Sequence, residues 1–123
     1  MKRAGGIATA DAAETCTERL ARFFPGAEPV RIPAHVFVLR PGLARLSEAV
    51  VVEYRAEGHA IFVSTLPLEF DDRVVMERAR NGATASAKSR ATDATVTAVQ
   101  YHEGKKAVAV RFLKGDCEWV MKP

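Results

Sequence analysis

The stretch that decides the fold is TVTAVQYHEGKKAVAVRFL, residues 95–113. Apolar residues alternate with polar or small ones on both sides of the Glu103-Gly104 pair, which is typical of a tight turn. The alternation predicts two antiparallel strands, at about residues 95–102 and 106–113. The inner face of the second strand is expected to carry Val108, Val110 and Phe112. The hairpin indicates a protein built from short antiparallel strands.

The same period-two pattern recurs upstream, in runs bounded by Gly and Pro turn signals. The chain holds 14 Val against 10 Leu and Ile together, and this β-branched bias favours strands. Further strands are expected at residues 30–38, with Pro33 at an edge or bulge, at 48–55, with Val50, Val52 and Tyr54 on one face, at 59–65, at 73–80 and at 117–121. Asn81-Gly82 predicts a two-residue hairpin turn. Six or seven short strands predict a mainly β fold, a small antiparallel β-barrel.

One helix is expected before the strands, at residues 10–25, with Thr9 or Asp11 as its N-cap. Its apolar face recurs at three- and four-residue intervals through Cys16, Leu20, Phe23 and Phe24, and Pro25-Gly26 ends it. We expect this face to dock on the rest of the domain, or else to form a homodimer interface through Leu20, Phe23 and Phe24. Residues 1–9 carry no periodic pattern and are expected to be disordered, and the barrel domain is assigned to residues 29–121.

Composition bounds the function before any motif is considered. The chain has 123 residues, enough for one domain, and its 48% hydrophobic content argues against global disorder. No apolar run is long enough to cross a bilayer, so a cytoplasmic protein without membrane contact is expected. Residues 73–114 carry a net charge of +6 against −3 in the remainder. This basic half suggests either an anionic partner or a solvated strand face.

The sequence carries none of the common catalytic motifs. There is no GxSxG, HExxH or GxxxxGK[ST], and His35, His59 and His102 are scattered. Cys16 and Cys117 are too far apart to suggest a metal site. Asp71-Asp72 suits a turn better than acid–base work, because adjacent strand residues point to opposite faces. We therefore expect no enzyme, no catalytic residue, no metal and no cofactor.

The layout of the strands resembles the PilZ family of bacterial barrels, whose better-known members bind cyclic di-GMP. The resemblance covers about two-thirds of the chain and depends on the order and spacing of its pieces. These pieces are residues 30–36 as the opening strand, 58–65 after the signature turn, Pro67-Leu68 ahead of 72–74, and 94–99, Gly104 and 107–113 as the closing hairpin. The resemblance implies a PilZ-like β-barrel.

The two ligand motifs of the family are mostly missing. No RxxxR occurs in the chain, although paired guanidinium groups are what grip guanine edges and phosphates in the family. Against the family's [D/N]xSxxG, this sequence has Glu53 in place of Asp or Asn, Arg55 in place of Ser, and Gly58 as the one match. The resemblance therefore implies a degenerate member, in which cyclic di-GMP binding is weak or absent.

Three functional hypotheses follow. The first is a PilZ-like adaptor that acts through a protein partner. The second is a cyclic di-GMP receptor that uses rearranged residues, with Arg31, Glu53, Arg55, Gly58 and Arg111 as the candidate ligand-binding set. The third is a small basic barrel that binds nucleic acid, for which Tyr101 is the one exposed aromatic candidate because Phe62 and Phe112 suit the core.

Overall fold

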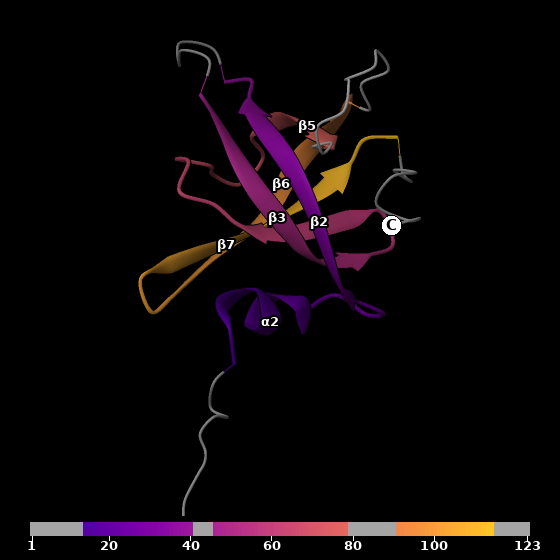
Figure 1. Ribbon diagram of the computed structural model, residues 1–123, viewed down its shortest axis with the longest axis vertical. Helices are drawn as coiled ribbons and strands as arrows, with labels where there is room; N and C mark the ends of the chain where they lie inside the picture. Colours follow the sequence, from indigo (N-terminus) through magenta and orange to yellow (C-terminus); the bar gives the residue numbers. More distant parts are fainter. Residues whose placement is uncertain (1–13, 41–45, 79–90, 115–123) are drawn as a thin grey trace, which may run out of the picture.

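The computed structural model describes residues 14–40, 46–78 and 91–114. In these residues the chain forms a closed antiparallel β-barrel, preceded in the sequence by one short helix that lies below the barrel in Figure 1. The mainly β barrel with an N-terminal helix is therefore confirmed. The elements are α2 (Cys16–Ala21), β2 (Glu28–Val38), β3 (Ser47–Ala56), β4 (His59–Val63), β5 (Arg73–Arg78), β6 (Ala91–His102) and β7 (Lys105–Phe112). The expected Asn81-Gly82 turn, the strand at 117–121 and residues 1–9 lie outside the described residues.

Closure of the barrel depends on β2, which pairs on both of its sides. The strand order is β2-β3-β4-β7-β6-β5, and β2 then pairs with β5 to complete the ring. Ala34, for example, stands opposite Val50 of β3 and opposite Arg78 of β5. The β2–β3 pairing shifts register between Pro29 and Ile32, so a bulge lies just before Pro33, as expected for a proline within a strand.

The barrel interior is filled by alternate side chains of every strand. Val108 and Val110 are fully buried and Phe112 is 1% exposed, which confirms the expected inner face of β7. The loop between β4 and β5 adds Leu66 and Leu68 to the same cluster. The other members of this core are Ile32, Ala34, Val36, Val38, Val50, Val52, Ala60, Phe62, Val74, Met76, Ala94 and Val96.

A bulge overturns one expectation about β3. The β3–β4 pairing shifts register between Val52 and Tyr54, so Tyr54 stands opposite Ile61 rather than continuing the inward series. Val50 and Val52 point into the barrel, whereas Tyr54 packs against the helix on the outside. An extra residue in one strand moves every later side chain to the opposite face, and simple alternation does not reveal it.

Helix α2 covers the outer face of the β4–β7 part of the barrel. Its buried Cys16, Leu20 and Ala21 pack against Ile61 of β4 and the outward alanines of β7, Ala107 and Ala109. Small outward side chains let a helix approach the sheet closely, so the Ala-Val-Ala-Val repeat of β7 serves both the core and the docking of the helix. The helix thus docks on its own domain, which was the first of the two expectations for it.

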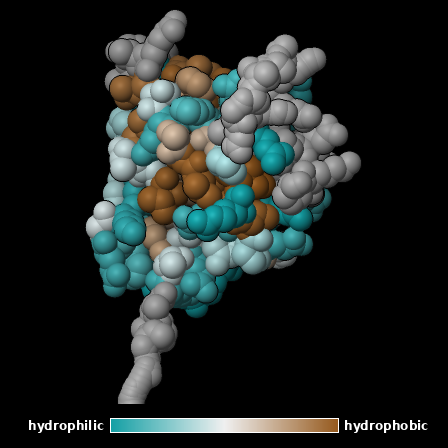
Figure 2. Space-filling model, viewed as in Figure 1, coloured by the Kyte–Doolittle hydropathy of each residue, from teal (hydrophilic) through white to brown (hydrophobic). Residues whose placement is uncertain are grey.

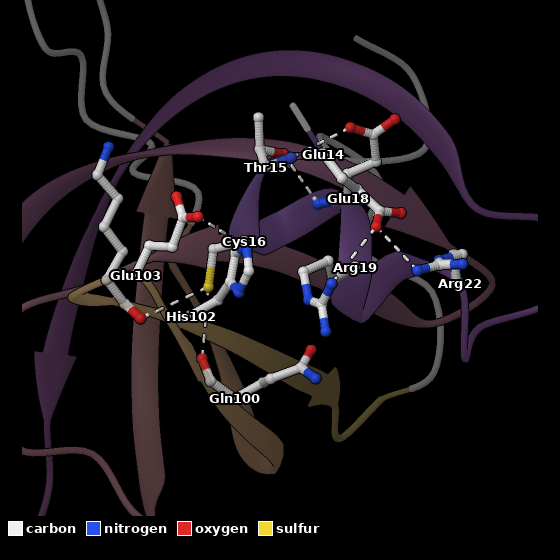
Figure 3. A network of polar contacts seen from close by, with 10 residues as sticks. Glu14, Thr15, Cys16, Glu18, Arg19, Arg22, Gln100, His102 and Glu103 are labelled. Atoms are coloured by element: carbon white, nitrogen blue, oxygen red, sulfur yellow. Dashed lines mark hydrogen bonds and ion pairs between the residues drawn. The ribbon is translucent and has the colours of Figure 1, made fainter. Parts of the chain in front are cut away.

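The helix is shorter than expected and begins at Cys16 rather than near residue 10. Thr15 is the N-cap, because its Oγ1 accepts a hydrogen bond from the Glu18 amide at 3.0 Å while the Glu18 carboxylate accepts one from the Thr15 amide at 3.2 Å (Figure 3). This reciprocal pair is a capping box, and it fixes the first residue of the helix. Thr9 and Asp11 lie outside the described residues, and because Glu14 and Thr15 are not helical, neither of these expected caps is the N-cap of α2.

The expectation that Phe23 docks on the domain together with Leu20 is wrong. Regular helix ends at Ala21, and the next amides bond three residues back, from Phe23 to Leu20 and from Phe24 to Ala21. The tighter turn leaves Phe23 72% exposed. Phe24 is half-buried against the apolar cluster that α2 forms with β4 and β7. The centre of its ring lies 4.9 Å from the centre of the His59 ring.

Leu20→Ala tests whether this docking stabilises the fold. Leu20 is 4% exposed, so truncation should lower the free energy of unfolding by about 2–5 kcal/mol. Phe23→Ala on the same segment is the matched control and should change it by less than about 0.5 kcal/mol. Chemical denaturation of both variants measures this. Equal losses in the two variants would contradict the placement of Phe23 in solvent.

Candidate functional site

The turn between β3 and β4 is where the resemblance places ligand chemistry. Gly58 has φ +72°, a conformation that favours glycine, and its carbonyl accepts a hydrogen bond from the Phe112 amide at 2.9 Å. Beside the turn lies a shallow pocket of about 90 Å³, lined by Gly26, Glu28, Arg55, Ala56 and Glu57. Gly58 therefore holds the turn and the end of β7 together, which is a structural role.

Arg55 lines this pocket but is engaged by a carboxylate of its own chain. It stands opposite Glu28 in the β2–β3 ladder, and its guanidinium donates to the Glu28 carboxylate at 3.1 Å. The Arg55 side chain is 19% exposed against 61% for Glu28, so water screens the pair. A ligand that used Arg55 would have to compete with Glu28.

Glu53 is likewise engaged within the fold. The hydroxyl of Thr17, a buried residue of α2, donates to the Glu53 carboxylate at 2.6 Å. Burial, together with the nearby carboxylates of Glu18 and Glu53, raises the pKa of the neighbouring Tyr54. Glu53 thus anchors the helix to β3, and the first position of the degenerate motif has a structural partner.

The remaining two candidates, Arg31 and Arg111, are not brought together. Arg31 is exposed on β2 and Arg111 is exposed on β7, and in the six-strand ring these strands stand on opposite walls. Arg55 lies on a third strand, β3, where it is paired with Ala60. Ala60 belongs to the interior core, so Arg55 is on the inner face of the sheet, whereas Arg31 and Arg111 are exposed. The structure therefore does not gather the three arginines around one point.

Arg111 belongs instead to a row of residues that sequence reasoning missed. It stands opposite His59 of β4 on one side and opposite Thr95 of β6 on the other, and Arg73 of β5 flanks Thr95 in turn. Both arginines are exposed, and within the described residues neither forms an ion pair. Such a row attracts anions. Only the strand register, which the sequence does not show, brings these residues together.

A neighbouring wall of the barrel, formed by β3, β2 and β5, carries an apolar surface, which we call the β2–β5 face. Figure 2 shows hydrophobic side chains gathered over the front of the barrel, where β2 and β3 lie in Figure 1. Leu39, just after β2, is 48% exposed, and Val51 is 39% exposed. The face is made of the outward side chains of β3, β2 and β5 and of Leu39, namely Val51, Ala49, Pro33, His35, Phe37, Leu39, Val75 and Glu77.

Tyr101 is 72% exposed near the tip of the β6–β7 hairpin, as the nucleic-acid hypothesis requires. The Lys106 ammonium lies 6.0 Å from the centre of its ring, a distance at which a cation is attracted to the aromatic face. Phe62 and Phe112 are core residues, as expected. A single aromatic residue with one adjacent lysine is a small platform for stacking bases.

The barrel end that includes the β4–β5 loop is held by two carboxylates. The Arg40 guanidinium donates to both oxygens of Asp72 and to the Pro67 carbonyl, and the Glu69 amide donates to Asp72 at 2.7 Å. Asp72 was expected to be only a turn residue, and nothing in the sequence links it to Arg40, 32 positions away. The hydrogen bond from Arg40 is the main cause that holds the pKa of Asp72 below its usual range.

Glu48 on β3 holds the start of the same loop. It accepts hydrogen bonds from the hydroxyls of Ser64 and Thr65, each at 2.7 Å, and from the Thr65 amide. Burial raises the pKa of Glu48, but these hydrogen bonds outweigh burial and leave the pKa lower than usual. Both carboxylates therefore secure the loop that inserts Leu66 and Leu68 into the core.

Two searches of the described residues bear on other classes of site. No three His, Cys, Asp or Glu side chains in residues 14–40, 46–78 and 91–114 lie close enough to hold a metal ion. Within the same ranges, no helix has the length and hydropathy needed to span a membrane. Neither finding assigns a function.

Comparison with known proteins gives no match from which a function could be assigned. No family model matches the sequence, and no curated protein matches it.

Asp72→Asn tests whether the Arg40–Asp72 contact makes the fold sensitive to acid. Because the folded pKa of Asp72 is lowered, its contribution to stability is present above the ordinary carboxyl pKa of about 4 and is lost as the pH falls through the lower folded value. The variant should be less stable than the wild type at pH 7 and should lose less stability on acidification. Urea unfolding at pH 7 and at about pH 3 measures both effects.

Asp71→Asn is the matched control for this experiment. Asp71 is exposed and has φ +77°, a conformation that asparagine tolerates, and its side chain takes no part in the Arg40–Asp72 contact, so this variant should keep the pH dependence that the contact causes. A pH dependence in Asp72→Asn equal to that of the wild type would contradict the role assigned to the Arg40–Asp72 pair.

Proposed function

We propose that this chain is a non-enzymatic, PilZ-like binding module of the bacterial cytoplasm that acts as an adaptor through protein–protein contacts. The observation that carries the proposal is the β2–β5 face, which leaves Val51 and Leu39 more than one-third exposed on a wall that the described helix does not cover. An exposed apolar surface of this kind marks an interaction site.

The state of the motif residues supports the same proposal. Glu53 is bonded to Thr17 and Arg55 to Glu28, while Arg31 and Arg111 stand on opposite walls. A dissociation constant of 1 μM corresponds to about 8 kcal/mol of binding free energy. A solvent-screened ion pair contributes at most about 1 kcal/mol. Contacts of that kind from separate arginines fall well short, so cyclic di-GMP is not expected to bind in the usual way.

A cyclic di-GMP receptor with rearranged arginines is the second candidate. It is favoured by the row of Arg111, Thr95 and Arg73 beside His59, which could receive a phosphate without the motif residues. Nucleic-acid binding would use the same basic row with Tyr101 as a stacking platform. Both candidates have an anionic ligand, so a titration with each ligand separates them from an adaptor.

Calorimetric titration with cyclic di-GMP at physiological salt tests the proposal. We expect no saturable heat at protein concentrations that detect a dissociation constant of about 1 μM. Arg111→Ala and Arg55→Ala should behave like the wild type. Saturable binding at or below that value, lost in Arg111→Ala, would overturn the adaptor proposal in favour of the rearranged receptor.

A parallel titration with a single-stranded oligonucleotide covers the third candidate. Affinity that falls steeply with salt and is lost in Tyr101→Ala would assign the barrel to nucleic acid. The adaptor proposal predicts no salt-dependent affinity for the oligonucleotide in the wild type or in Tyr101→Ala.

A further inference from the structure

The β2–β5 face has an internal order that goes beyond its apolar character. Strands β2 and β5 lie side by side, and their outward residues form rungs. One rung pairs His35 with Glu77, and the next pairs Phe37 with Val75. The rings of His35 and Phe37 are stacked with their centres 5.8 Å apart, so β2 presents a continuous aromatic edge.

The polar rung is available for outside contacts. Among the described residues neither His35 nor Glu77 forms an ion pair, although they are neighbours in the ladder. The next position along β2 is Leu39, whose amide donates to the Arg73 carbonyl at 3.0 Å, so Leu39 and Arg73 lie side by side as a third rung. Each rung thus combines one residue on the β2 side with a different one on the β5 side.

This order makes the face complementary to itself. Consider a two-fold axis that lies just outside the face, parallel to the strands and midway between β2 and β5. This axis places each β2 position opposite the β5 position of the same rung in a second copy. Phe37 then meets the partner's Val75, and His35 meets the partner's Glu77. Leu39 meets the partner's Arg73, whose aliphatic stem can cover a leucine while its charge stays in water.

We propose that the chain forms a two-fold symmetric dimer through the β2–β5 face. Such an interface is isologous, so every favourable contact occurs twice. The match of His35 to a carboxylate and of Phe37 to an apolar side chain, made by one and the same axis, favours a second copy over an unrelated protein. The inference rests on the proposed role in protein contacts and names the partner. It also differs from the dimer expected through the helix, because Leu20 is buried against the chain's own barrel.

Sedimentation equilibrium of the full chain tests the dimer. The wild type is expected to reach twice the monomer mass of 13.4 kDa as its concentration rises. Phe37→Asp and Val75→Asp should shift the distribution to the monomer, because each places two carboxylates in the apolar rungs of the interface. Phe23→Asp is the matched control, an equally drastic change at a 72% exposed site away from this face, and should leave the dimer intact.

A charge exchange tests the axis itself. His35→Glu should weaken the dimer, because the new carboxylate lies opposite the partner's Glu77. The double variant His35→Glu/Glu77→Lys should restore it, because opposite charges then face each other again across the axis. Circular dichroism of every variant checks that the barrel is folded, which is expected because these side chains point outward.

Each other outcome overturns the inference. A wild type that stays monomeric at all concentrations, or a dimer that survives Phe37→Asp, excludes this interface. A monomer in which Phe37→Asp shifts the fluorescence of Trp119, the one tryptophan of the chain, to longer wavelength would show that the C-terminal segment occupies the face. A monomer without that shift would leave the proposed adaptor role standing, with a different protein as the occupant.

Discussion

The pairing of β2 with both β3 and β5 is the constraint on which the rest of the structure depends. It closes the ring of strands, and closure gives every strand one face toward a sealed interior and one face outward. The interior is filled by residues such as Val36, Phe62 and Val108, all of them fully buried. Each outward face must then be polar, covered or left open to a partner, and the two apolar walls of this barrel differ in that respect.

The wall around β4 and β7 is covered by the chain itself. Outward alanines at 107 and 109 admit α2, and Thr17 of the helix binds Glu53 on β3. This contact engages a residue that the family resemblance assigns to ligand binding. In the adjacent turn, Arg55 is paired with Glu28 of β2, so two of the motif positions are engaged within the fold. The wall around β2 and β5 has no such cover among the described residues, and interaction with other molecules is proposed there.

Much of the barrel can be predicted from alternation and turn chemistry. The inward series through Val108, Val110 and Phe112 can be predicted from the sequence because no bulge interrupts β7. The positive φ values of Glu103 and Gly104 match the expected tight turn. Tyr54 cannot be placed that way, since the bulge after Val52 reverses its face. The Thr15–Glu18 capping box is visible in the sequence and was the better signal for the start of the helix. The row of Arg111 and Arg73 and the Arg40–Asp72 pair depend on strand register and on long-range contacts, which no local pattern reveals.

Amide hydrogen exchange along β2 tests the closure of the barrel most directly. In a closed ring, successive amides of residues 34–38 point alternately toward β3 and β5, and both partners accept. Slow exchange at every one of these amides is therefore predicted. Fast exchange at alternate amides would show that β2 is an open edge, and it would contradict both the barrel and the two unlike walls derived from it.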